Sequence, residues 1–129
     1  MRERGRGGII LCGSTSSYMG AAWLASYTAS KAFSRIFSEA LWAECRVLGI
    51  DVLHLTIGFT GTPAMARLGY DLSAAQAPEE VAQEALDNVA NGPVWIAGGS
   101  RNLELAMKRS TVEDRAEAIL AVSTPRRET

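Results

Sequence analysis

The chain has 129 residues, with 13 Lys and Arg against 14 Asp and Glu and a formal net charge of −1. This length suits one domain, and 47% hydrophobic with 21% charged residues is a globular composition, not a disordered one. The near-neutral charge argues against a nucleic-acid-binding protein, and no apolar run reaches the roughly 18 residues of a membrane span. We therefore expect a cytoplasmic protein with neither nucleic acid nor membrane as partner.

Three apolar runs predict β-strands. The first, residues 8–12, is short, continuous and bounded by glycine, which is typical of a strand buried on both faces of a parallel sheet. A loop rich in Ser and Thr follows it at residues 13–17. Residues 51–57 and 94–97 form the second and third runs, and a glycine ends each of them.

Helical patterns follow each of these strands. Residues 25–48 predict a long helix with one buried apolar face, ending at Gly49. That face comprises Phe33, Ile36, Phe37, Ala40, Leu41, Val47 and Leu48. Pro78 and two glutamates open a second helix that runs to about residue 90. Residues 102–122 predict further helical turns, with a break at Ser110 or Thr111 and an end at Thr124-Pro125.

The order of these elements is strand, helix, strand, helix, strand, helix. Such alternation predicts an α/β fold with parallel strands and right-handed crossover connections. Two cysteines, Cys12 and Cys45, give no disulfide framework, and we interpret both as buried thiols. With His54 as the only histidine, we predict no metal site, and we interpret His54 as a core or edge residue of its strand.

Tyr27 and Lys31 are the main candidates for chemistry. They stand four residues apart near the start of the long helix, so they share one face. A phenol ionises only near pH ~10, but a nearby cation favours the phenolate and makes an acid/base of it. A packed tyrosine beside a solvated lysine is the alternative interpretation. Ser14 favours the chemical one, because it follows the first strand at its carboxyl end, where open α/β sheets bind ligands.

Together, Ser14, Tyr27 and Lys31 resemble the short-chain dehydrogenase/reductase family, which has Ser, Tyr and Lys at this spacing. Residues 27–31 read Tyr-Thr-Ala-Ser-Lys, a common form of the family's Tyr-x-x-x-Lys, and residues 5–10 resemble its fifth strand. Two positions depart from the family pattern. Gly13 replaces the usual Ser or Asn, and residues 57–62 read Ile-Gly-Phe-Thr-Gly-Thr where the family has Pro-Gly-x-x-x-Thr.

The resemblance implies an NAD- or NADP-dependent oxidoreductase that interconverts a small-molecule carbonyl and its alcohol. Tyr27 would be the general acid/base, Lys31 would support it and hold the nicotinamide ribose, and Ser14 would polarise the carbonyl. The resemblance also places Gly58 and Thr62 at the nicotinamide end of the cofactor. Four further residues are expected to line the substrate pocket: Thr15, Tyr18, Trp23 and Met65.

No Gly-rich turn in the sequence follows a strand and opens a helix, as a dinucleotide fingerprint does. Residues 1–129 therefore resemble the C-terminal half of a classical member: one partial domain of a Rossmann-like, doubly wound parallel sheet, without its nucleotide-binding N-terminal half. The resemblance implies three parallel strands with residues 52–57 in the centre. It also implies a homo-oligomer formed through the helix at 25–48, because the family often dimerises there.

Two other functions compete with this interpretation. A non-catalytic remnant of the fold, serving as a scaffold or interaction module, is favoured by the missing nucleotide half, and we expect residues 1–129 alone to be inactive. A Ser/Lys hydrolase ranks below both. The sequence lacks the Ser-x-x-Lys and Gly-x-Ser-x-Gly patterns of such enzymes, since Thr28 stands three residues before Lys31.

Overall fold

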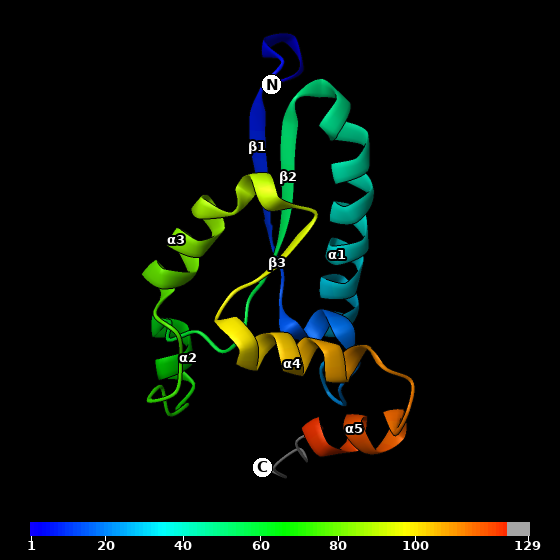
Figure 1. Ribbon diagram of the computed structural model, residues 1–129. Helices are drawn as coiled ribbons and strands as arrows, with labels where there is room; N and C mark the ends of the chain where they lie inside the picture. The colour runs from blue at the N-terminus through cyan, green and yellow to red at the C-terminus, as the bar shows by residue number, and fades with distance from the viewer. Residues whose placement is uncertain (124–129) are drawn as a thin grey trace.

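A parallel sheet of three strands carries the helices of this chain, whose residues 1–123 are described by a computed structural model (Figure 1). The strands are β1 (Gly7–Cys12), β2 (Ile50–Thr56) and β3 (Val94–Ile96), in the order β1-β2-β3. Both pairs are parallel, with Cys12 opposite Leu55 and His54 opposite Val94. The predicted α/β fold with β2 in the centre is confirmed.

Five α-helices and four 3-10 turns surround the sheet within residues 1–123. The helices are α1 (Ala25–Cys45), α2 (Pro63–Arg67), α3 (Pro78–Asp87), α4 (Gly99–Ser110) and α5 (Arg115–Val122). The turns are η1 (Arg2–Arg4), η2 (Thr15–Tyr18), η3 (Arg46–Leu48) and η4 (Val89–Asn91). The predicted helix at 25–48 thus corresponds to α1 and η3. Thr124-Pro125 lies outside the described residues.

Local sequence explains several of these boundaries. Pro78 occupies the first turn of α3, where its missing N–H costs nothing, and Glu79 and Glu80 face the positive end of the helix dipole. Thr62 caps α2 by accepting a hydrogen bond from the backbone N–H of Met65. Gly49 ends η3 in the left-handed conformation (φ 67°), which glycine adopts without steric cost.

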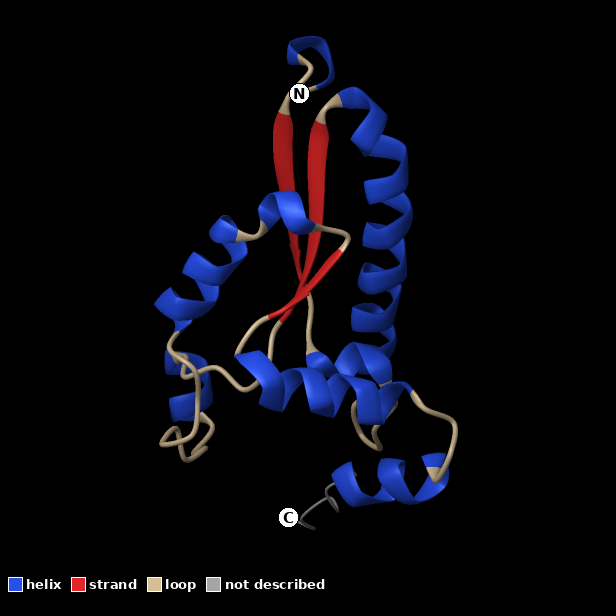
Figure 2. Cartoon of the chain, viewed as in Figure 1, coloured by secondary structure: helices blue, strands red, loops and turns tan. Residues whose placement is uncertain are grey.

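The two faces of β2 pack against different helices, because side chains alternate along a strand. Leu55 lies in an apolar core with Val81 and Ala85 of α3 and with Ala97 after β3. His54 and Thr56 point to the opposite face, and both are fully buried. Figure 2 shows α1 along one side of the long β1–β2 pair and α3 along the other.

The prediction for the buried face of α1 was wrong. Phe33, Ile36 and Phe37 are 71%, 55% and 47% exposed, whereas the residues of α1 that are buried are Thr28 and Ser38. Hydroxyl side chains are tolerated here because each donates to a carbonyl of its own helix, Thr28 to Ala25 and Ser38 to Ser34. The apolar stripe of α1 therefore faces away from the sheet.

The first strand is also less buried than its apolar sequence predicts. β1 is half-buried along most of its length, because within the described residues it pairs with a neighbour on one side only. Cys12 is exposed and Cys45 is partly exposed, so the prediction of two buried thiols was wrong. β1 is an edge strand, and Cys12 lies at its carboxyl end.

The carboxyl ends of the three strands point toward α4 (Figure 1). The η2 turn that follows β1 lies at this same end of the sheet and contacts both α1 and α4. This arrangement brings together residues that are far apart in the sequence. No helix within residues 1–123 combines the length and the apolar character that crossing a membrane requires.

Candidate active site

The loop after β1 presents Ser14 at the carboxyl end of the sheet. The backbone N–H groups of Gly13 and Thr15 donate to the carbonyls of Leu55 and Ile57, at 2.7 and 2.9 Å. These two bonds extend the β1–β2 pairing beyond the strands and fix the loop. Ser14 caps η2, and its Oγ accepts a hydrogen bond from the N–H of Ser16 at 3.1 Å.

The first two turns of α1 carry Tyr27 and Lys31 on one face. The Lys31 Nζ lies 5.9 Å from the centroid of the Tyr27 ring, within cation–π range. Nζ also donates a hydrogen bond of 3.1 Å to the carbonyl of Cys12, the last residue of β1. Lysine therefore links the end of the strand to the tyrosine, whose side chain is 44% exposed.

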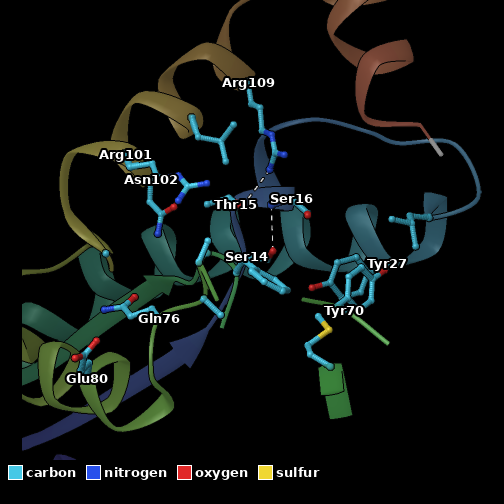
Figure 3. Close-up of a pocket in the computed structure, with 18 residues that line it drawn as sticks. Ser14, Thr15, Ser16, Tyr27, Tyr70, Gln76, Glu80, Arg101, Asn102 and Arg109 are labelled. Atoms are coloured by element: carbon cyan, nitrogen blue, oxygen red, sulfur yellow. Dashed lines mark hydrogen bonds between the residues drawn. The ribbon is translucent and has the colours of Figure 1, made fainter. Parts of the chain in front are cut away.

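A pocket of about 800 Å³ lies between the Ser14 loop, α1 and α4 (Figure 3). Such a volume falls in the range of small-molecule sites. Its lining includes five residues predicted from the sequence: Ser14, Thr15, Tyr27, Gly58 and Met65. The structure thus places the candidate hydroxyls of Ser14 and Tyr27 in one cavity.

Four other predicted residues are not among those that line this pocket. Lys31 lies against Tyr27, and Thr62 uses its hydroxyl to cap α2. The Tyr18 hydroxyl lies 3.5 Å from Thr56 Oγ1, and the guanidinium of Arg35 stacks on its ring at 4.6 Å. Trp23 adopts a left-handed backbone conformation (φ 65°), and its side chain is 66% exposed.

The far wall of the pocket was not predicted. It is formed by residues of α4 and of the segment before α3, among them Gln76, Arg101, Asn102 and Arg109. Arg109 donates from Nη1 to Thr15 Oγ1 at 3.1 Å and so joins α4 to the residue after Ser14. No motif in the sequence pointed to this wall, because its residues lie far from Ser14 along the chain.

One carboxylate ties this wall together. Glu84 of α3 accepts hydrogen bonds from Gln76 Nε2 at 2.6 Å, from Trp95 Nε1 at 3.2 Å and from the Gly98 N–H at 3.2 Å. The side-chain oxygen of Gln76 is buried without a partner in the described chain. A single acidic side chain therefore holds α3, β3 and the start of α4 in register.

Beneath the Ser14 loop lies a buried chain of polar side chains. His54 Nδ1 is 3.3 Å from Thr56 Oγ1, which is in turn 3.5 Å from the Tyr18 hydroxyl. Burial lowers the pKa of His54 from 6.5 to about 4, and the charges of Arg35 and Lys31 add to this effect. His54 is therefore a neutral core residue, and its Nε2 has no hydrogen-bond partner in the described chain.

The remaining properties of the site concern its charge and its ligand groups. Burial lowers the pKa of Arg109, whose guanidinium is partly desolvated at the pocket wall. Within residues 1–123, no group of three or more His, Cys, Asp or Glu side chains is arranged to hold a metal ion. The groups available to a ligand are hydroxyls, arginines, an amide and aromatic rings.

Sequence comparison finds related proteins. The family described as short chain dehydrogenase matches residues 1–73. The chain is 30% identical over 122 residues to the 7beta-hydroxysteroid dehydrogenase of Clostridium sardiniense, a match that covers 92% of this chain and 46% of the relative. The chain thus spans about half the length of the curated relatives it matches.

Solved structures show the same likeness. One, from work on the stereoselectivity of 7beta-hydroxysteroid dehydrogenase, matches with a TM-score of 0.79 and 28% identity, covering 92% of this chain and 48% of its own. A short-chain dehydrogenase from Sphingobium yanoikuyae in complex with NADPH matches with a TM-score of 0.65. It is 20% identical and covers 99% of this chain and 50% of its own, so this likeness shows the fold alone.

Proposed function

Because this chain belongs to the short-chain dehydrogenase family, we propose that it carries the catalytic half of an NAD- or NADP-dependent oxidoreductase. The reaction is the reversible transfer of hydride between the cofactor and a small-molecule carbonyl or alcohol. One observation supports this most strongly. Ser14 and Tyr27 line the same pocket at the carboxyl ends of the strands, with Lys31 against the Tyr27 ring.

In this proposal Tyr27 moves the proton. Its hydroxyl donates a proton to the carbonyl oxygen during reduction and accepts one from the alcohol during oxidation. The ammonium of Lys31 lies 5.9 Å from the centroid of the Tyr27 ring, where its charge would stabilise the negative charge that develops on the tyrosine oxygen as the proton leaves. Ser14 donates a hydrogen bond to the carbonyl oxygen of the substrate and so orients it. Its Oγ–H is available for this role, because Ser14 Oγ acts as an acceptor toward Ser16.

The residues present suit the nicotinamide end of the cofactor, which supplies the hydride when bound. Lys31 has three donors and uses one of them on the Cys12 carbonyl, so others remain for the ribose hydroxyls. Gly58 and Thr62 follow β2 at the same end of the sheet and would line the nicotinamide site.

The pyrophosphate end of the cofactor needs a Gly-rich turn at a helix N-terminus, and residues 1–129 contain no such sequence. We therefore propose that these residues form a partial domain and that the turn lies outside them. The alternative is a non-catalytic scaffold that retains the fold. The cytoplasmic location stays a prediction from the sequence.

We also propose a homo-oligomer formed through α1. Phe33, Ile36 and Phe37 are exposed on one stripe of this helix, and the rings of Phe33 and Phe37 stack with centroids 5.8 Å apart. Contiguous exposed apolar side chains mark contact surfaces in soluble proteins. A second copy of α1 would cover this stripe.

The substitution Tyr27→Phe tests the catalytic assignment in the complete enzyme that contains this segment. It keeps the ring and removes the proton donor, so we expect turnover to fall roughly 100-fold or more with cofactor affinity unchanged. Tyr70→Phe is the matched control, since Tyr70 lines the same pocket and should keep its turnover within a few-fold. Near-wild-type turnover of Tyr27→Phe would refute the assignment.

A further inference from the structure

Helix α4 presents a regular stripe to the pocket. Arg101, Leu105 and Arg109 are spaced four residues apart, which places them on one face of the helix, and all three line the cavity. At 1.5 Å per residue, the two arginines are anchored about 12 Å apart along the helix. Figure 3 shows Arg109 directed toward Thr15, while Arg101 lies nearer Asn102.

Arg109 is a partly buried cation without a counter-charge in the described chain. Its guanidinium donates to the neutral hydroxyl of Thr15, and its Nε is buried with no hydrogen-bond partner. Within residues 1–123 the only ion pair is the one between Arg35 and Glu39, so Arg109 has no carboxylate partner there. A desolvated charge without a partner is unfavourable, and an incoming anion would relieve that cost.

The rest of the lining leaves the pocket with an excess of positive charge. Glu80 is the one acidic residue among those that line it, and it forms no ion pair with Arg101 or Arg109. Figure 3 shows Glu80 beside Gln76, on the opposite side of the pocket from Arg109. The end of the pocket next to Ser14 and Thr15 is therefore cationic.

We propose that this pocket binds a carbonyl or alcohol substrate that carries an oxyanion, a carboxylate or a phosphate, and that Arg109 holds it. This inference rests on the proposed function, because Ser14 and Tyr27 define where the reacting carbonyl lies. Arg109 contacts the residue directly after Ser14, so the oxyanion lies a short distance from that carbonyl. A guanidinium suits this task because its donors match the two oxygens of a carboxylate.

The test compares three ketones of similar shape: 4-acetylbenzoate, 4-acetylphenyl phosphate and the neutral 4-acetylbenzamide. Each is titrated calorimetrically into the full chain without nicotinamide. We expect at least one anion to bind roughly tenfold or more tightly than the amide, as a charge-assisted hydrogen bond implies. The ratio of benzoate to phosphate affinity identifies the oxyanion. Equal affinity for the amide and both anions would overturn the proposal.

Two variants locate the effect. Arg109→Gln should lower anion affinity to that of the amide, whereas Lys108→Gln removes the same charge from a neighbouring α4 residue outside the pocket and should keep the preference. Leu105→Glu places a carboxylate four residues from both arginines and should abolish the preference by supplying the missing counter-charge. The role of Arg109 would be contradicted if Lys108→Gln lost the preference. It would also be contradicted if Arg109→Gln and Leu105→Glu both kept it.

This experiment is independent of the proposed reaction. It measures binding without cofactor or turnover, so its failure leaves the Tyr27→Phe test intact. Conversely, an anion preference in an enzyme that tolerates Tyr27→Phe would leave the binding site valid and the acid/base assignment wrong.

Discussion

The imidazole of His54 occupies the space that a side chain at Gly13 would need. A Cβ built on Gly13 would overlap both Nε2 and Cε1 of the His54 ring. This contact accounts for one departure from the family pattern, in which Ser or Asn precedes the proposed catalytic serine. A large ring on β2 and a missing side chain after β1 compensate for each other. Together they set the distance between the Ser14 loop and β2.

Gly13→Ala should therefore destabilise the protein by roughly 1–3 kcal/mol, the usual cost of overpacking. The same substitution in a His54→Ala background should cost close to nothing, because the space is then free. Urea denaturation of the four proteins of this double-mutant cycle measures the coupling. Gly20→Ala is the control, since no atom lies within 4 Å of a Cβ at Gly20. Additive effects at Gly13 and His54 would contradict the contact.

The buried imidazole also predicts how stability depends on pH. The pKa of His54 is lowered by burial to about 4, whereas the unfolded chain binds this proton near pH 6.5. The folded state binds the proton more weakly, so the free energy of unfolding should fall as the pH drops from about 6.5 to about 4. The full loss is roughly 3 kcal/mol at ~1.4 kcal/mol per pKa unit. Urea midpoints at several pH values test this, and His54→Asn should flatten the profile in that window.

Residues 1–129 expressed alone should show no nicotinamide-dependent turnover. Without a Gly-rich turn, the pyrophosphate has no helix N-terminus on which to bind. The assay follows the loss of nicotinamide absorbance as NADH or NADPH is oxidised in the presence of a panel of ketones. Clear oxidation above a Tyr27→Phe control would show that this segment binds the cofactor by itself, contrary to the expectation.

The exposed stripe of α1 predicts the effect of a charge placed on it. Phe33→Arg should reduce the oligomer to a smaller species, because a guanidinium would be buried at the centre of the proposed contact. Sedimentation velocity measures the change. Val112→Arg is the control, since Val112 is 86% exposed and lies outside α1. Identical sedimentation of wild type and Phe33→Arg would exclude α1 as the interface.

The sheet could be predicted because its signals are local. The apolar run of β2 and the glycines that bound it fix a buried strand, and the alternation with helices fixes parallel pairing. The buried face of α1 could not, because periodicity shows that a helix has an apolar stripe but not what covers that stripe. Here the buried residues of α1 are Thr28 and Ser38, whose hydroxyls are satisfied by carbonyls of their own helix.

The candidate site, too, could be predicted only where its residues lie close together in the sequence. Ser14, Tyr27 and Lys31 lie within 18 residues of one another, so their spacing was informative. Arg109 reaches Thr15 across 94 residues, and no local pattern specifies that contact. The positions of Tyr18 and Trp23 were missed as well. Tyr18 lies in the η2 turn with its hydroxyl near Thr56 Oγ1, and Trp23 lies before α1 in a left-handed conformation, and no local pattern specifies either placement.

The two walls of the pocket are held in place by different elements of the fold. Ser14 and Tyr27 are held by β1, β2 and α1, whereas the start of α4 is attached to α3 and β3 through the Glu84 carboxylate and the Gly98 N–H, and its end reaches Thr15 through Arg109. To change the substrate, one could therefore replace the helix at 99–110 and keep Glu84, Trp95 and Gly98, whose hydrogen bonds hold the start of that helix.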